Sequence, residues 1–242
     1  MSRERRAHHQ SHQHHSTRFI SRWTQDKKVK PSSMAPNFSQ SEFTQLASEK
    51  QIEKTVQALQ AHGIRVVVVD TGEEARTSVL DLIPDGAEVF NSQSRTLEVI
   101  GLAEQIQHAT HFQSVRARLQ TLDRVTQRNE MRELLASPDV LVGSVHAITE
   151  PGEIMLASAT GSQLGPAAWG AGLVIWVMGT QKLVRTLSDG LRRIREYSLP
   201  LESERAQQAY GQTSAINKLL IIDAEAYPGR ITIVLVKQQL GF

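Results

Sequence analysis

Hydrophobic residues along the chain fall into seven short, mostly apolar runs of strand length. These runs cover residues 64–70, 87–91, 139–149, 153–158, 172–179, 217–223 and 230–237. The first run, IRVVVVD, is continuous, which predicts a strand buried on both faces. Pro151 and Gly152 separate two of the runs and predict a tight hairpin. A turn at YPGR is expected to join the last two runs.

Between these runs, apolar residues recur at the spacing of an α-helix. The segments with this spacing are residues 43–62, 72–82, 97–106, 115–136, 186–197 and 201–210. Gly63 is a stop signal for the first segment, and Thr71 with Glu74 resembles a capping box for the second. Strands alternate with helices in the first half and hairpins enter in the second, which predicts an α/β fold with a mixed sheet.

Residues 1–38 lack this pattern and are predicted to be a disordered, basic, histidine-rich tail before one domain at 39–242. One interpretation of this tail is metal binding by its histidines. A second is an organellar presequence, because the tail is rich in arginine and serine. We favour a third interpretation, an upstream extension with Met34 as the working start. The tail histidines are His8, His9, His12, His14 and His15.

The net charge of +2 conceals an uneven distribution, because residues 1–33 carry a net +6 and residues 34–242 a net −4. The folded part therefore gives no electrostatic argument for nucleic-acid binding. No apolar run reaches the roughly 18 residues that span a bilayer. The chain has no cysteine, which excludes disulfides, thiolate catalysis and cysteine-bound metal clusters within it. A cytoplasmic location is the simplest expectation.

Two polar loops after strand runs are candidates for binding an anion, since ligands gather at the carboxyl ends of strands in open α/β sheets. Ser92 and Ser94 offer hydroxyls at a helix start, or else they only cap that helix. The glycine-rich loop 159–172 lets the backbone approach a phosphate or carboxylate, or is only an ordered connection. Its candidate residues are Thr160, Gly161, Ser162 and Gln163.

A third loop follows the run 172–179 and contains Gln181 and Lys182. Lys182 suits an anionic substrate as a compact point charge, although a solvated lysine near a helix start is the alternative. The chain contains no Walker loop, dinucleotide fingerprint or metal-binding motif in its core. No cofactor or metal is therefore predicted there.

Glu150 stands at the predicted hairpin. A carboxylate in a partly buried loop can act as a base or nucleophile, whereas an exposed one only closes the turn. His146 lies four residues earlier, so the two side chains share a face of a regular strand. A His–Glu pair is one interpretation, and a structural histidine hydrogen-bonded within the strand is the other.

Several segments, taken together and in order, resemble the LUD domain, a lactate-utilisation domain formerly of unknown function. They are SRTLEVIG at 94–101, Thr149-Glu150-x-Gly152, GTQKLV at 179–184 and NKLLII at 217–222. The likeness covers residues 43–242. It implies an α/β fold with a mixed, largely parallel sheet and helices on both faces, of the NagB/RpiA/CoA-transferase-like group.

The resemblance also implies lactate-type organic-acid metabolism beside iron–sulfur subunits, in which this chain is the partner without a cluster. In CoA-transferases of this fold group, a Glu followed by x-Gly carries the acyl group, and Glu150-Pro151-Gly152 is similar. We therefore expect Glu150 to be the acid/base or nucleophile, beside an anion held by the polar loops and Lys182. The alternatives are a CoA-transferase- or isomerase-like enzyme using Glu150, and a noncatalytic binding or assembly module.

Overall fold

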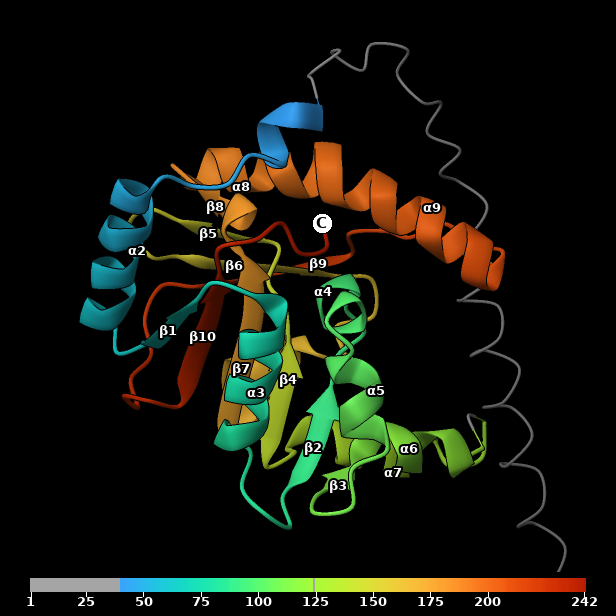
Figure 1. Cartoon of the computed structure of the whole chain (residues 1–242). Helices are drawn as coiled ribbons and strands as arrows, with labels where there is room; N and C mark the ends of the chain where they lie inside the picture. Colours follow the sequence, from blue (N-terminus) through green and yellow to red (C-terminus); the bar gives the residue numbers. More distant parts are fainter. Residues whose placement is uncertain (1–39, 124) are drawn as a thin grey trace, which may run out of the picture. The chain divides into compact units, whose positions relative to one another are not determined.

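The computed structural model describes residues 40–123 and 125–242 (Figure 1). The predicted α/β fold is confirmed within these ranges, because a largely parallel set of strands is covered by helices on both faces. The histidine-rich tail lies outside the described residues, so its interpretations stay predictions. None of the helices in the described ranges is long and apolar enough to cross a membrane.

Six strands form the main sheet in the order β1-β10-β7-β4-β2-β3, and every neighbouring pair is parallel. Parallel neighbours need long crossover connections, which the alternation of strands and helices in the sequence supplies. The strands are β1 (Arg65–Val69), β2 (Glu88–Asn91), β3 (Gln113–Ser114), β4 (Val140–Gly143), β7 (Leu173–Gly179) and β10 (Ile231–Val236).

The helices differ from the predicted segments mainly in where they break. They are α2 (Glu49–Ala61), α3 (Gly72–Leu82), α4 (Arg95–Val99), α5 (Leu102–Gln107), α6 (Val115–Thr121), α7 (Arg128–Ala136), α8 (Leu187–Arg193) and α9 (Leu199–Tyr210), with the short turns η1 (Gln40–Phe43), η2 (Pro166–Gly170), η3 (Thr180–Lys182) and η4 (Ile194–Ser198). The segment 97–106 breaks at Gly101, whose φ is +72°. The segments 43–62 and 115–136 also break, whereas 186–197 and 201–210 join through η4.

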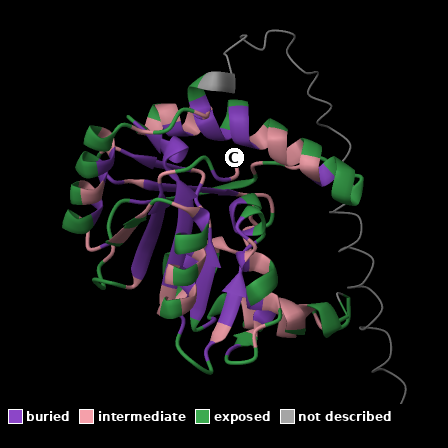
Figure 2. Ribbon diagram, viewed as in Figure 1, coloured by how far each residue is buried: buried purple, intermediate pink, exposed green. Residues whose placement is uncertain are grey.

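Side chains of β7 alternate between two apolar layers, as expected for a strand with a period of two. Ile175 and Val177 pack into the layer of α3, α4 and α5. Trp176 and Met178 pack into the layer of α2, α6, α7 and the second sheet. Figure 2 shows the central strands as buried along their length. The loops at the strand ends are therefore the part of this fold that is free to bind a ligand.

A second sheet has the order β8-β5-β6-β9. Its strands are β5 (Ala147–Thr149), β6 (Ile154–Ser158), β8 (Leu183–Val184) and β9 (Lys218–Ile222). The predicted hairpin is confirmed, because β5 and β6 pair antiparallel around Pro151 and Gly152. Gly152 has a φ of +101°, a conformation that glycine adopts without steric cost.

The prediction of one strand over 139–149 is wrong. β4 and β5 belong to different sheets, and residues 144–146 carry the chain from one sheet to the other. A Cβ at Gly143 would lie 2.5 Å from Ser92 Oγ and from the Trp176 ring. Glycine is therefore required where the chain leaves the main sheet. Residues 144–146, which follow it, belong to neither sheet.

The expected turn at YPGR is confirmed, because the Arg230 N–H donates to the Tyr227 oxygen at 3.0 Å between β9 and β10. The two strands do not pair, since β9 pairs with β6 while β10 lies between β1 and β7. One further expectation is corrected. The strand β1 is not buried on both faces, and Val68 is 39% exposed. The cause is its place at the edge of the sheet, where the covering layers end.

Candidate functional site

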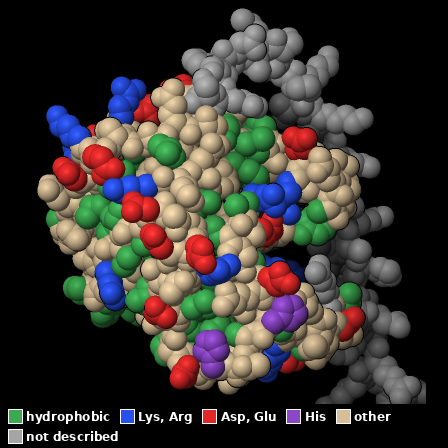
Figure 3. All heavy atoms as spheres, in the orientation of Figure 1, with side chains coloured by type: hydrophobic (Ala, Val, Ile, Leu, Met, Phe, Trp, Pro, Cys, Tyr) green, Lys and Arg blue, Asp and Glu red, His purple; other side chains and the backbone are tan. Residues whose placement is uncertain are grey.

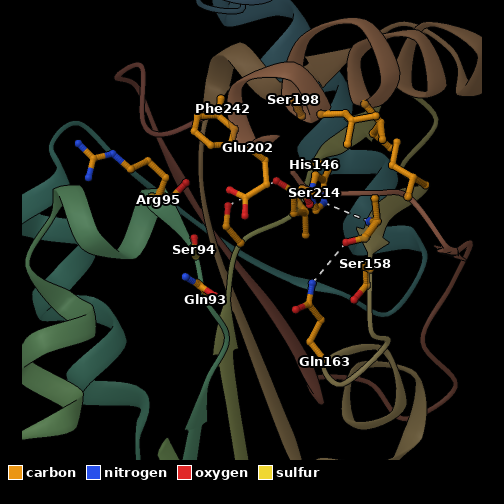
Figure 4. A pocket seen from close by; sticks show the side chains of 18 of the residues that line it. Gln93, Ser94, Arg95, His146, Ser158, Gln163, Ser198, Glu202, Ser214 and Phe242 are labelled. Carbon is orange, nitrogen blue, oxygen red and sulfur yellow. Dashed lines mark hydrogen bonds between the residues drawn. The ribbon is translucent and has the colours of Figure 1, made fainter. Parts of the chain in front are cut away.

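A polar cavity of about 260 Å³ lies at the carboxyl ends of β2 and β4 (Figure 4). Segments that follow β2, β4, β6 and β7 line it, together with η4 and the start of α9. Hydroxyl groups dominate the lining, with eight serine and threonine residues. They are Ser94, Thr96, Ser144, Ser158, Thr160, Ser162, Ser198 and Ser214. The lining therefore suits a small, oxygen-rich ligand.

Lys182 is the basic side chain buried at this cavity. It ends η3, the turn directly after β7, and is 2% exposed. Its Nζ donates to Thr96 Oγ1 and to Ser144 Oγ, both at 3.0 Å. No carboxylate of the described residues pairs with it. Burial, and then the positive charge of Arg193, lower the pKa of Lys182 well below its ordinary value.

Arg193 adds a second buried positive charge behind the cavity wall. Its Nη1 donates to the backbone oxygen of His146 at 2.6 Å and to Ser198 Oγ at 3.1 Å. Its Nε and Nη2 have no hydrogen-bond partner among the described residues. Its guanidinium lies 5.2 Å from the centre of the Tyr197 ring. Burial lowers the pKa of Arg193 to about 10, so it stays charged at neutral pH.

His146 lines the cavity as a neutral ring. Its Nδ1 accepts a hydrogen bond from the backbone N–H of Ala157 at 3.2 Å, drawn as a dashed line in Figure 4. Burial, followed by the charges of Lys182 and Arg193, lowers the pKa of His146 to about 3. Because Nδ1 is the acceptor, the proton of the neutral ring is on Nε2.

The carboxylate in the cavity lining, Glu202 on α9, is already neutralised. Arg205 clamps it through Nε at 2.8 Å and Nη2 at 2.7 Å. The hydroxyl of Tyr210, also on α9, lies 2.7 Å from the side-chain amide of Gln93. These contacts tie α9 to the loop after β2 across the cavity and leave Lys182 without a counter-charge.

The structure brings together six of the predicted site residues at the cavity and leaves four outside it. The six are Ser94, His146, Thr160, Ser162, Gln163 and Lys182. Ser92 packs against Gly143, and Gln181 donates to the backbone oxygens of Leu240 and Gly241. Gly161, with a φ of +87°, turns the loop beside Lys218.

Glu150 is the fourth residue outside the cavity, so the expected closeness to the polar loop is not found. Its Oε2 accepts from Lys54 Nζ at 2.6 Å, and the Glu150 side chain is 20% exposed. The strand β5 separates it from His146, a span of roughly 13 Å at the usual rise per residue. The two residues therefore form no pair, although no observation tests a chemical role for Glu150 itself.

Several residues in or behind the cavity wall were not identified from the sequence. Ser144 lies inside an apparently continuous strand, and Arg193, behind the wall, lies inside an amphipathic helix. Glu202 and Ser214 are distant in sequence from every polar loop that was considered. A buried arginine next to apolar Ile194 was the one local hint, since arginine is rarely placed on the apolar side of a helix.

Among the comparisons with known proteins, a family model identifies the family. A family model described as the LUD domain matches residues 52–239. A search of curated proteins finds no match. A solved structure of a DUF162 family protein from Deinococcus radiodurans is similar, with 12% identity and a TM-score of 0.49. That similarity covers 79% of this chain and 99% of that chain.

Proposed function

We propose that this chain, which belongs to the LUD domain family, binds a small organic acid in the cavity at the ends of β2 and β4. The membership predicted from the sequence segments is confirmed. One observation supports the ligand class most strongly: Lys182 lines the cavity with a buried amine, and no carboxylate of the described residues pairs with it.

A buried basic group without a carboxylate partner destabilises a fold, so it is a common mark of a binding site. Arg193 raises the positive potential further, because it too is buried and pairs with no carboxylate in the described ranges. An organic acid would bring the missing negative charge. The eight hydroxyl-bearing residues around the cavity would hydrogen-bond its oxygen atoms.

Within this class we propose a lactate-type acid of a few carbon atoms. The volume of about 260 Å³ favours small molecules, and a 2-hydroxy acid has the hydroxyl and carboxylate groups that such a lining binds. The sequence resemblance further supports work beside iron–sulfur subunits. Because the chain has no cysteine, the clusters of such a system would belong to a separate subunit.

The test is calorimetric titration of the full chain with L-lactate, pyruvate and lactamide, the neutral amide of lactate. We expect both acids to bind and lactamide not to bind. Lys182→Met should weaken acid binding at least about tenfold, because a hydrogen bond to a charged group contributes about 1.5–3 kcal/mol. Lys54→Met is the matched control, since Lys54 is exposed and pairs with Glu150 outside the cavity. Equal binding of acid and amide would contradict the proposal.

The partner is a separate proposal with its own test. Affinity purification of the tagged chain from its own cells should retain a protein with the visible absorption of iron–sulfur clusters. Failure to retain such a protein under anaerobic conditions would contradict the proposed iron–sulfur partner but not the proposed acid binding.

The transferase alternative requires an acyl group on Glu150. Incubation with acyl-CoA, borohydride treatment and peptide mapping would find it there or argue against it.

A further inference from the structure

We propose that Lys182 is a nucleophile whose amine forms an imine with the carbonyl carbon of a 2-oxo acid bound in the cavity. This inference rests on the proposed function and assigns a reaction to those of the bound small acids that carry a carbonyl group beside the carboxylate. It is carried by the hydrogen-bond geometry around the Lys182 amine and by the absence of any carboxylate partner in the described ranges.

The directions of the hydrogen bonds around Lys182 are fixed by the two hydroxyls that contact it. A hydroxyl has a single proton to donate. Thr96 donates its proton to the backbone oxygen of Leu240 at 3.2 Å, and Ser144 donates to that of Val145 at 3.4 Å. Both hydroxyls therefore accept from Nζ, which lies 3.0 Å from each.

A neutral amine has two N–H groups and one lone pair, so these two hydrogen bonds use both N–H groups and leave the lone pair free. No third partner of Nζ exists among the described residues, while Lys182 lines the cavity. The lowered pKa of Lys182 agrees with this arrangement, because burial favours the neutral form. A neutral, desolvated amine with a free lone pair is the activated state of a lysine nucleophile.

Other lysines of the described ranges provide the contrast. Lys54 is paired with Glu150 at 2.6 Å and Lys237 with Glu49 at 3.1 Å. The nearby carboxylate raises the pKa of Lys237 through a hydrogen bond and its charge. An ion pair keeps an amine protonated and removes its nucleophilic lone pair. Lys182 differs from both in burial and in having neutral neighbours.

The proposed step balances without an oxidant or reductant. The Nζ lone pair forms a C–N bond to the carbonyl carbon, the C=O π pair moves to oxygen, and a proton passes from nitrogen to that oxygen. The nitrogen lone pair then forms C=N, and the C–O bond breaks with a proton from solvent, releasing water. The product is a protonated imine, whose positive charge faces the carboxylate of the same acid. Thr96 and Ser144 are positioning residues that hold the amine.

The experiment compares pyruvate and L-lactate on the full chain with sodium cyanoborohydride present, followed by unfolding, digestion and mass spectrometry. Pyruvate should label the Lys182 peptide with the mass of the acid less one oxygen atom, and L-lactate should label nothing. Lys182→Met should lose the label, and Lys54→Met should keep it. Because the wild-type peptide map locates the label, the result stands even if Lys182→Met folds poorly.

Two failures are distinguishable when calorimetry accompanies the trapping. If pyruvate binds but Lys182 is not labelled, or if label spreads evenly over exposed lysines such as Lys54 and Lys218, imine formation is overturned and acid binding stands. If neither acid binds, the proposed function fails together with this inference. Trapping at Lys182 at least tenfold above every exposed lysine is the result that supports it.

Discussion

Two basic side chains in the interior of this chain have opposite surroundings. Arg230 lies 2.7 Å from Glu225, and their side chains are 10% and 7% exposed. Its guanidinium also donates to three backbone oxygens, those of Ala167, Ala168 and Ala171. Lys182 is more deeply buried, at 2% exposed, but has only two neutral hydroxyls as partners. The two sites differ most clearly in the presence of a carboxylate partner.

That difference separates a structural site from a functional one. Burial alone would raise the pKa of Glu225, but the Tyr227 backbone N–H and the Arg230 guanidinium outweigh it and lower the pKa. The charges of Glu225 and Arg230 therefore neutralise each other within the fold, and no ligand is needed to balance them. At Lys182 the fold leaves the charge balance open, which is how a site selects a ligand of opposite charge. Figure 3 shows positive and negative side chains interspersed over the face in view.

The largest expected effect on stability comes from removing the carboxylate of the Glu225–Arg230 pair. Glu225→Gln should lower the free energy of unfolding by about 3–5 kcal/mol, because it leaves the Arg230 charge with backbone oxygens but without its carboxylate. Acid binding should not change. Urea denaturation measures the loss, and Glu42→Gln is the control, since Glu42 pairs with Arg192 at the surface and should cost at most about 1 kcal/mol. A loss at Glu225 as small as the control's would contradict the comparison.

In mild acid, the free energy of unfolding should fall because of groups at the cavity before it falls because of the Arg230 pair. His146 has a folded-state pKa of about 3, below its unfolded value near 6.5. The unfolded chain therefore takes up a proton first, and stability falls as the pH drops from 6.5 toward 3, by at most about 1.4 kcal/mol per unit. The lowered pKa of Glu225 acts only below about 4.5. Urea midpoints at pH 7, 6 and 5 therefore report on the cavity groups His146 and Lys182, whose pKa values are both lowered, and not on the Arg230 pair.

His146→Asn tests that assignment, since its side-chain oxygen can still accept from the Ala157 N–H while lacking a titrating ring. We expect the variant to lose the part of the pH dependence between 7 and 5 that His146 contributes. Retention of the full slope would place the titrating group elsewhere, for example at Lys182, whose pKa burial also lowers.

Replacing the buried amine of Lys182 should stabilise the fold while weakening acid binding. Lys182→Met removes a buried amine and keeps a similar volume, so the free energy of unfolding should rise by about 1 kcal/mol at pH 7. Because folding lowers the pKa of Lys182, the wild-type cost is absent above about pH 10.5 and grows as the pH falls below it. The advantage of the variant should therefore shrink toward pH 10. A loss above about 2 kcal/mol would make Lys182 structural.

The sequence predicted the parts of this comparison that depend on local pattern. The run 172–179 and the residues that follow it placed Lys182 at a strand end, where ligands gather in α/β folds. The hairpin at Pro151 and Gly152 followed from turn chemistry. Thr71 was correctly read as a helix cap, since its side chain accepts from the Glu74 N–H.

The sequence could not show which residues surround Lys182. Whether a buried lysine has a counter-charge depends on tertiary contacts between Thr96, Ser144 and Lys182, which lie far apart in the chain. Residues 139–149 read as one strand because apolar periodicity does not record a change of sheet. Glu150 was expected at the site because it is close in sequence to the polar loop, but β5 carries it to the other end of the hairpin.

The smallest effect is expected at Glu150, which forms an ion pair with the exposed Lys54. Glu150→Gln should lower the free energy of unfolding by about 0.5 kcal/mol, because Lys54 is 63% exposed and water screens the pair. Acid binding and imine trapping at Lys182 should both persist, since Glu150 does not line the cavity. A loss of binding in a folded Glu150→Gln protein would return this carboxylate to the site. The assignment would then have to include the hairpin turn as well as the cavity around Lys182.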